Sequence, residues 1–123
     1  MARKILIIDD EDDIREVAAL SLESVAGWDV VTASSGAQGL TKAAKEKPDA
    51  IVLDVMMPGM DGPTTFLELK KNPATAHIPV LLLTAKVHPT DQKRFAGLGV
   101  KAVLFKPFDP MKLSEQIARV LGW

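Results

Sequence analysis

Five short runs of Ile, Val, Leu and other apolar residues recur along this 123-residue chain. Most of them lack the strict alternation of polar and apolar residues that marks a strand with one face in water. Such runs are typical of strands that are covered on both faces. They occupy residues 5–8, 30–31, 50–53, 78–83 and 100–105.

The segments between these runs carry helix signals. In the first segment, apolar residues recur at three- and four-residue steps from Ile14 to Val25 and form one stripe along a helix. We expect helices near residues 12–26, 36–46, 63–71, 90–97 and 110–121. Capping residues mark their ends: Ser34, Ser35, Gly62-Pro63 and Asp109-Pro110 at starts, and Gly27, Gly97 and Gly99 at ends.

Strand and helix alternate five times, which predicts an α/β fold with a doubly wound, five-stranded parallel sheet. The chain length suits one domain. Because the last helical pattern ends two residues before Trp123, we expect a single domain over residues 1–123 with no output domain.

Composition excludes several classes of protein. The formal net charge of −1 provides no field that would recruit nucleic acid or an anionic membrane. The absence of Cys excludes disulfides and thiolate metal sites. The apolar runs are far shorter than the roughly 20 residues of a membrane-spanning helix, and the first residues do not resemble a signal peptide. We expect a soluble, cytoplasmic protein.

Polar residues follow four of the five predicted strands. They are Asp9 and Asp10 after the first strand, Asp54 after the third, Thr84 after the fourth and Lys106 after the fifth. In open parallel sheets, ligands bind beyond the carboxyl ends of the strands. The sequence therefore predicts a functional site at this edge of the sheet.

Five consecutive acids, from Asp9 to Asp13, form the first of these turns. A nucleotide- or flavin-binding fold would place a glycine-rich turn there to meet a phosphate, and no such motif occurs in the chain. Glu11, Asp12 and Asp13 fall in the first helical turn, where carboxylates complement the helix dipole. Asp9 and Asp10 end a buried strand, where uncompensated carboxylates are costly, so we take them as site candidates.

Asp9, Asp10 and Asp54 converge if the first and third strands are neighbours. Three close carboxylates need a divalent cation, and an all-oxygen site fits Mg²⁺, Mn²⁺ or Ca²⁺ better than zinc. Thr84 and Lys106 add a hydroxyl and a positive charge, which both suit a phosphoryl oxygen. The combination predicts a phosphoryl-transfer site in which an Asp can become an acyl phosphate.

The chain resembles the receiver domain of two-component response regulators over essentially its whole length. Four motifs carry the resemblance, in this order: ILIIDDE at residues 5–11, PDAIVLDVMMPGMDG at 48–62, IPVLLLTAK at 78–86 and KPF at 106–108.

The resemblance implies the flavodoxin-like (βα)5 receiver fold with strand order 2-1-3-4-5. It implies that Asp54 accepts a phosphoryl group from a phosphohistidine of a partner histidine kinase or phosphotransfer protein, and that Lys106 and Thr84 bond to it. The chain would then bind a downstream target protein or pass the phosphoryl group on. It would be a phosphoacceptor with slow self-dephosphorylation, not an enzyme with turnover.

For the metal, the resemblance implies Mg²⁺, with Mn²⁺ as the alternative. Asp10 would ligate it directly and Asp9 mainly through water, while Asp54 and the backbone carbonyl of Met56 would complete the protein ligands. The resemblance also implies a cis Lys106-Pro107 bond. It implies a monomer or weak homodimer that binds neither nucleic acid nor membrane directly.

One position departs from the family pattern. Many receivers carry a Tyr or Phe three residues before the Lys, and this aromatic ring changes rotamer together with the Thr. Here that residue is Val103, and the chain has no Tyr. We therefore expect a weaker or differently shaped conformational response, through a smaller packing change or through Phe105.

Two other functions compete with this interpretation. A phosphatase of the haloacid-dehalogenase-like type needs a second Asp two residues after its nucleophile, and Met56 at that position cannot transfer a proton. A pseudo-receiver that only binds a partner is disfavoured by the complete set of acids, Thr84 and Lys106. His77 and His88 both lie near Pro, and we expect them in loops rather than acting as phosphodonors.

Overall fold

The computed structural model of the chain describes residues 3–85 and 88–123. Strands and helices alternate through these residues, as the sequence predicts. Lys86, the last residue of the IPVLLLTAK motif, lies outside the described residues. The elements are β1 Lys4–Ile8, α1 Asp12–Ala26, β2 Asp29–Ala33, α2 Gly36–Glu46, β3 Ala50–Asp54, α3 Gly62–Lys71, β4 Val80–Thr84, α4 Pro89–Ala96, β5 Ala102–Phe105 and α5 Leu113–Leu121.

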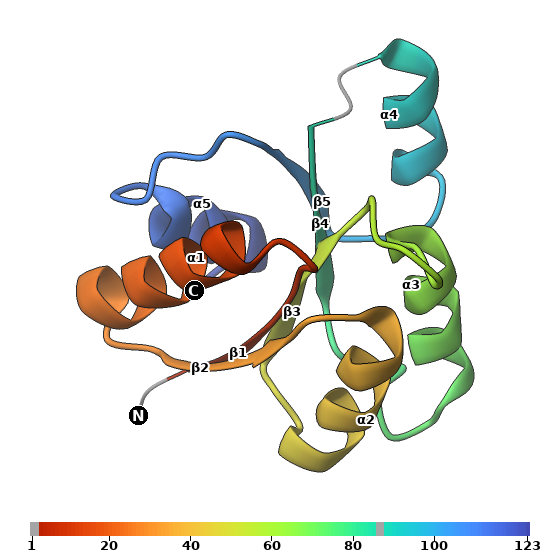
Figure 1. Cartoon of the computed structure of the whole chain (residues 1–123), viewed down its shortest axis with the longest axis horizontal. Coiled ribbons are helices and arrows are strands. Elements are labelled where there is room, and N and C mark those ends of the chain that lie inside the picture. The colour runs from red at the N-terminus through yellow and green to blue at the C-terminus, as the bar shows by residue number, and fades with distance from the viewer. Residues whose placement is uncertain (1–2, 86–87) are drawn as a thin grey trace.

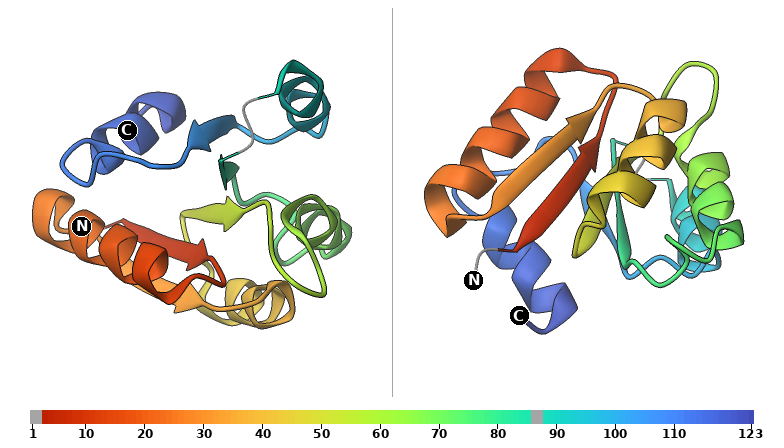
Figure 2. Two further views of the ribbon diagram at one scale, coloured as in Figure 1. Left: turned by 45° about the horizontal axis from the view of Figure 1, so that its top comes forward. Right: turned by 90° about the horizontal axis from the view of Figure 1, so that it is seen from below.

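The five strands form one parallel sheet in the order β2-β1-β3-β4-β5, which confirms the predicted order. β1 pairs with β2 on one side and with β3 on the other (Figure 2). The chain thus changes direction across the sheet at β1 and β3, whose carboxyl ends are adjacent because Ile8 pairs with Leu53. This switch point is where open α/β sheets bind their ligands.

Helices cover both faces of the sheet. α1 and α5 lie on one face, and α2, α3 and α4 lie on the other (Figure 1). The first layer packs on a core that includes Leu22 and Ile117, and the second on a core that includes Phe66 and Phe95. Every residue of β3 and β4 is buried. Covering on both faces explains why these strands read as continuous apolar runs.

Most predicted helix ends are confirmed. The Ser35 hydroxyl accepts a hydrogen bond from the Gln38 amide at 3.1 Å and caps α2. Gly27 ends α1 with a left-handed φ of 70°. Gly97 is the C-cap of α4, as predicted, but its φ of −74° is right-handed, and the positive φ after this helix belongs to Gly99, at 99°.

The predicted start of the last helix at residue 110 is wrong, since α5 begins at Leu113. The Asp109 carboxylate does accept a hydrogen bond from a backbone amide, that of Met111, at 2.9 Å. The Asp109 carbonyl accepts from Lys112 and Leu113 at 2.9 and 3.0 Å. These bonds close a separate turn, which precedes the helix rather than forming its first residues.

Two tryptophans meet at the amino ends of the strands, opposite the switch point. Trp28 lies just before β2 and Trp123 follows α5, with their rings 5.3 Å apart and nearly perpendicular at 86°. The Arg3 guanidinium lies 4.5 Å from the centre of the Trp123 ring, a cation–π contact. The two ends of the described chain are thereby held together.

Candidate functional site

The candidate site lies at the carboxyl ends of β1, β3, β4 and β5. Asp9 follows β1 and is fully buried, Asp54 ends β3 and is 3% exposed, and Thr84 ends β4 and is 1% exposed. Lys106 follows β5, and its amide donates a hydrogen bond to the Thr84 carbonyl at 2.9 Å. The parallel sheet thus places these four of the five predicted residues at one edge, and the fifth, Asp10, directly follows Asp9 in the chain.

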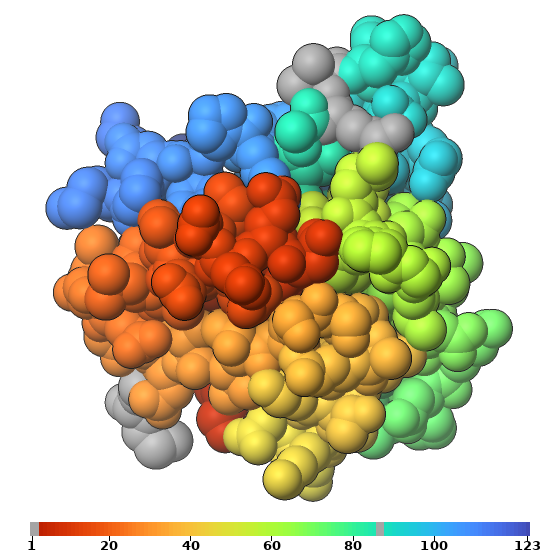
Figure 3. Space-filling view, in the orientation of Figure 1, coloured from red at the N-terminus to blue at the C-terminus, as the bar shows by residue number. Residues whose placement is uncertain are grey.

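The ammonium of Lys106 is the centre of this arrangement. Its Nζ lies 3.1 Å from Asp9 Oδ2, 3.1 Å from Asp54 Oδ1 and 3.1 Å from Glu11 Oε1. The Lys106 side chain is 11% exposed, so it is a largely buried cation held by three carboxylates. In Figure 3 the red segment that includes the turn between β1 and α1 lies against the loop that follows β3, in yellow-green.

Lys106 stays positively charged in this environment. Burial works to lower the pKa of its ammonium, but the hydrogen bonds to Asp9, Glu11 and Asp54 outweigh burial and hold the pKa above its usual value. The site therefore keeps a fixed positive charge at any physiological pH.

The pKa of Asp54 is shifted in the opposite direction from that of a typical ion-paired carboxyl group. Burial raises its pKa to about 7, and the negative charge of Asp9 and the adjoining Asp10 carboxyl group add to the effect, although Lys106 opposes it. One lysine thus does not compensate the carboxylates gathered here, and a further cation would favour the ionised form of Asp54.

Three buried oxygens of this cluster, Asp9 Oδ2, Asp10 Oδ1 and Asp54 Oδ2, accept no hydrogen bond within the described part of the chain. Of these, Asp9 Oδ2 lies 3.1 Å from the Lys106 ammonium. Carboxylate oxygens of Asp9, Glu11 and Asp54 lie within 4.8 Å of one another. Unpaired buried carboxylate oxygens at this spacing are what a hard divalent cation coordinates, so the residues present fit such an ion.

The turn after β1 is held by its own side chains. Asp9 Oδ1 accepts a hydrogen bond from the Glu11 amide at 2.9 Å. The Arg15 guanidinium donates to the Asp9 carbonyl at 2.8 Å and to the Asp12 carboxylate at 2.5 Å. These bonds fix the backbone from which the acidic side chains project.

The loop after β3 packs directly on the backbone of Asp54. The Gly62 amide donates to the Val55 carbonyl at 2.9 Å. A Cβ at Gly62 would lie 2.4 Å from the Asp54 carbonyl oxygen, so this approach requires glycine. Asp61 caps α3 by accepting a hydrogen bond from the Thr64 amide at 2.8 Å. Hydrogen bonds from the side chain and the backbone amide of Thr64 lower the pKa of Asp61. Nearby, the Met56 amide lies 3.4 Å from Asp54 Oδ1.

Sequence reasoning missed one residue of the site. Glu11 is read from the sequence as a complement to the helix dipole, whereas the structure pairs its side chain with Lys106. The signal was its place directly after Asp9 and Asp10, on a turn that already holds two site acids.

Other predictions are settled by the geometry. The Lys106-Pro107 bond is cis, as expected. His77 lies between α3 and β4, and His88 precedes α4, where its Nδ1 accepts a hydrogen bond from the Thr90 amide at 3.2 Å. Both histidines are thus outside helices and strands. Val103 is half-buried on β5, against the core beneath α2, α3 and α4.

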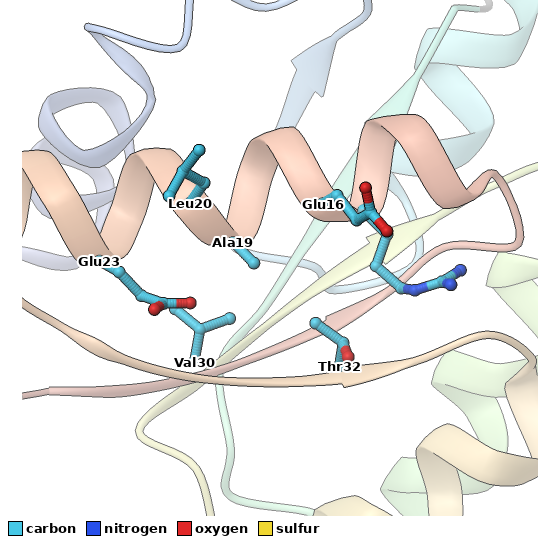
Figure 4. A pocket seen from close by; sticks show the side chains of 7 residues that line it. Glu16, Ala19, Leu20, Glu23, Val30 and Thr32 are labelled. Atoms are coloured by element: carbon cyan, nitrogen blue, oxygen red, sulfur yellow. The ribbon is translucent and has the colours of Figure 1, made fainter.

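A groove of about 380 Å³ lies elsewhere, between α1 and the edge strand β2 (Figure 4). Glu16, Glu23 and Thr32 are among the residues that line it, and none of Asp9, Asp54 and Lys106 does. It is therefore separate from the cluster at the strand ends. Within residues 3–85 and 88–123, no helix has the length and apolarity needed to cross a membrane.

Known proteins resemble this chain in sequence and in fold. The alkaline phosphatase synthesis transcriptional regulatory protein PhoP of Bacillus subtilis is 40% identical over 121 residues, which are 98% of this chain and 49% of PhoP. The chain spans about half the length of the curated relatives it matches.

Two solved structures superpose closely. The Vibrio cholerae chemotaxis protein CheY4 has a TM-score of 0.90 at 32% identity, covering 98% of this chain and 99% of CheY4. The receiver domain of the sensor histidine kinase PA1611 from Pseudomonas aeruginosa, solved with a magnesium ion in its active site cleft, has a TM-score of 0.87 at 26% identity and covers both chains fully. The family model described as the response regulator receiver domain matches residues 5–118, and this chain belongs to that family.

Proposed function

We propose that Asp54 accepts a phosphoryl group from a phosphohistidine of a partner histidine kinase or phosphotransfer protein. The observation that carries the proposal is the different environment of the two carboxylate oxygens of Asp54. One oxygen of Asp54 is 3.1 Å from the Lys106 ammonium, while the other is buried without a hydrogen-bond partner in the described chain. An oxygen without a hydrogen-bond partner keeps its lone pairs available for nucleophilic attack.

In the transfer, the free oxygen of Asp54 attacks the phosphorus atom. The bond between phosphorus and the histidine nitrogen breaks, and that nitrogen keeps the electron pair. The products are an acyl phosphate on Asp54 and a free imidazole. Lys106 offsets the negative charge on the phosphoryl oxygens, and Thr84, at the end of the neighbouring strand, is the proposed hydroxyl donor.

We assign the cation to Mg²⁺, with Mn²⁺ as the alternative. Asp9, Asp10, Asp54 and the Met56 carbonyl are the proposed protein ligands, and the unpaired oxygens of Asp10 and Asp54 support this set. When bound, the cation would neutralise charge on the transferred phosphoryl group. Glu11, which lies within 4.8 Å of Asp9 and Asp54, is an additional carboxylate at the same place.

The chain is then a signalling phosphoacceptor, not a turnover enzyme. Its proposed output is phosphorylation-dependent binding of a target protein, or a further phosphoryl transfer. PhoP is a transcriptional regulator about twice as long as this match, so the absence of an output domain stays a prediction. The proposed state is a cytoplasmic monomer or weak homodimer.

Incubation with acetyl phosphate and Mg²⁺, followed by intact-mass measurement, tests the proposal. The wild-type chain should gain one phosphoryl group, and hydroxylamine should remove it because acyl phosphates are labile to that nucleophile. Asp54→Asn should remain unlabelled, and Asp29→Asn, which changes an exposed carboxylate on β2, should label like the wild type. Retention of the label by Asp54→Asn would show that the acceptor is another residue.

A further inference from the structure

The Lys106 ammonium lies close to three carboxylate oxygens, of which those of Glu11 and Asp54 accept its hydrogen bonds. Asp9, Glu11 and Asp54 each contribute one of them, at 3.1 Å. An ammonium has three hydrogens to donate. A phosphoryl group on Asp54 would therefore compete for this ammonium with the carboxylates that already surround it.

Glu11 differs from the other two partners in its exposure. The side chains of Asp9 and Asp54 are 1% and 3% exposed. Asp9 would be left buried and uncompensated if it lost the ammonium, and Asp54 is the residue that carries the phosphoryl group itself. The side chain of Glu11 is 59% exposed and can return to water. Glu11 is therefore the partner whose release costs least.

The backbone of Glu11 is fixed while its side chain can move. Its amide donates to Asp9 Oδ1 at 2.9 Å, and its carbonyl accepts from the Arg15 amide at 3.0 Å. Glu11 is also the N-cap residue of α1, yet its side chain makes no capping hydrogen bond. The side chain can thus swing away from Lys106 without unravelling the helix.

Resting on the proposed function, we propose that Glu11 is a displaceable counter-ion of Lys106. It holds the ammonium while Asp54 is unmodified and releases it when a phosphoryl group arrives. A phosphoryl group adds about −1.5 to −2 charges beside the Glu11 carboxylate, and repulsion drives the exchange. Glu11 is a positioning residue that sets how tightly the site holds a phosphoryl group.

Glu11 could instead be a direct ligand of the divalent cation, because its carboxylate lies in the same cluster. The two roles predict opposite changes when the charge of Glu11 is removed. A displaced counter-ion competes with the phosphoryl group, so its removal tightens phosphoryl binding. A cation ligand supports the bound ion, so its removal weakens Mg²⁺ binding strongly.

The test titrates beryllofluoride, a phosphoryl mimic, into the full chain at saturating Mg²⁺, and separately titrates Mg²⁺ alone, both followed by NMR. The variants are Glu11→Gln and the matched control Asp13→Asn. Asp13 is an exposed carboxylate in the same first turn of α1, so its change in charge measures the general effect of the local field.

We expect Glu11→Gln to lower the half-saturating beryllofluoride concentration about threefold relative to Asp13→Asn. Mg²⁺ affinity should change equally in the two variants. An unchanged beryllofluoride affinity in Glu11→Gln would overturn the counter-ion role, as would a tenfold loss of Mg²⁺ affinity confined to that variant. If wild-type protein bound no beryllofluoride, the proposed function would fail together with this inference, whereas the preceding outcomes leave the proposed function intact.

Discussion

At the residue scale, the site gathers more negative charge than its lysine can balance. Lys106 contacts Asp9, Glu11 and Asp54, and the pKa of Asp54 is still raised to about 7. The unmodified site is therefore electrostatically strained, and both a cation and proton uptake relieve it. Two predictions follow from this imbalance, one for protons and one for Mg²⁺.

Asp54 should make folding stability depend on pH when no divalent cation is present. Its pKa of about 7 in the folded chain lies above the ordinary value of 3.8, so the folded state binds the proton more tightly than the unfolded state. The free energy of unfolding should fall as pH rises from about 4 to 7. Asp54→Asn should lose this contribution and be more stable than wild type at pH 8, by about 2 kcal/mol.

Urea unfolding with EDTA across this pH range measures the effect. Asp29→Asn, an exposed carboxylate on β2, serves as the control and should follow the wild-type curve. Equal pH slopes for wild type and Asp54→Asn would contradict the raised pKa of Asp54.

Mg²⁺ should stabilise the fold through Asp10. The buried Oδ1 of Asp10 has no hydrogen-bond partner among the described residues and is available to a cation. A ligand at 100 times its Kd adds about 2.7 kcal/mol to the free energy of unfolding. The wild-type chain should show such a gain in thermal or urea unfolding, while Asp10→Asn should lose most of it and Asp13→Asn should keep it. A full gain in Asp10→Asn would remove Asp10 from the ligand set.

Most residues of the site could be predicted from the sequence because each one ends or follows a strand, and a parallel sheet brings such positions to one edge. Glu11 could not be assigned in the same way. It lies in a turn, and which partner its flexible side chain reaches depends on Lys106, 95 positions along the chain. Residue spacing within the first turn carries no information about that contact.

At the element scale, side chains that accept hydrogen bonds from nearby backbone amides mark where α2, α3 and α4 start. Strand positions were predictable because burial on both faces produces continuous apolar runs. The start of α5 was not, since Asp109 and Pro110 favour a turn as readily as a helix. The hydrogen bonds from the Met111 and Leu113 amides to Asp109 close that turn, and the helix begins after it.

The loop between β3 and α3 should tolerate no side chain at Gly62. Gly62→Ala would place Cβ 2.4 Å from the Asp54 carbonyl oxygen, so the loop must shift away from the phosphoacceptor strand. We expect a loss of about 2–3 kcal/mol in unfolding free energy and slower labelling by acetyl phosphate. Gly97→Ala is the matched control, because its φ is −74° and its nearest contacts are 3.6 Å away. Equal stability of the two variants would argue against the close approach.

At the scale of the whole molecule, the sheet separates two helical layers that can respond differently to the site. α1 begins beside the acids and packs with α5, whereas α4 lies on the other face beyond β4 (Figure 1). Val103 on β5 packs toward the second layer, while Phe105 is 42% exposed. We therefore expect the response of that layer to depend on a small aliphatic side chain.

Val103 should move little when the site is occupied. The isopropyl group of Val is too short to move between a buried and an exposed position by changing its rotamer. With beryllofluoride and Mg²⁺, methyl NMR shifts should change more at Thr84 than at Val103. A large displacement at Val103 would contradict the weak response expected from the missing aromatic ring.

The tryptophan pair gives the molecule an optical property that follows from its position. Trp28 and Trp123 are the two tryptophans of the chain, which has no tyrosine, so its near-ultraviolet emission arises where their rings meet. That place is at the amino ends of the strands, a sheet's length away from Asp54. Intrinsic fluorescence should therefore follow the loss of the native structure while staying silent during occupation of the site. Stability and ligand binding can then be read from one sample with separate signals.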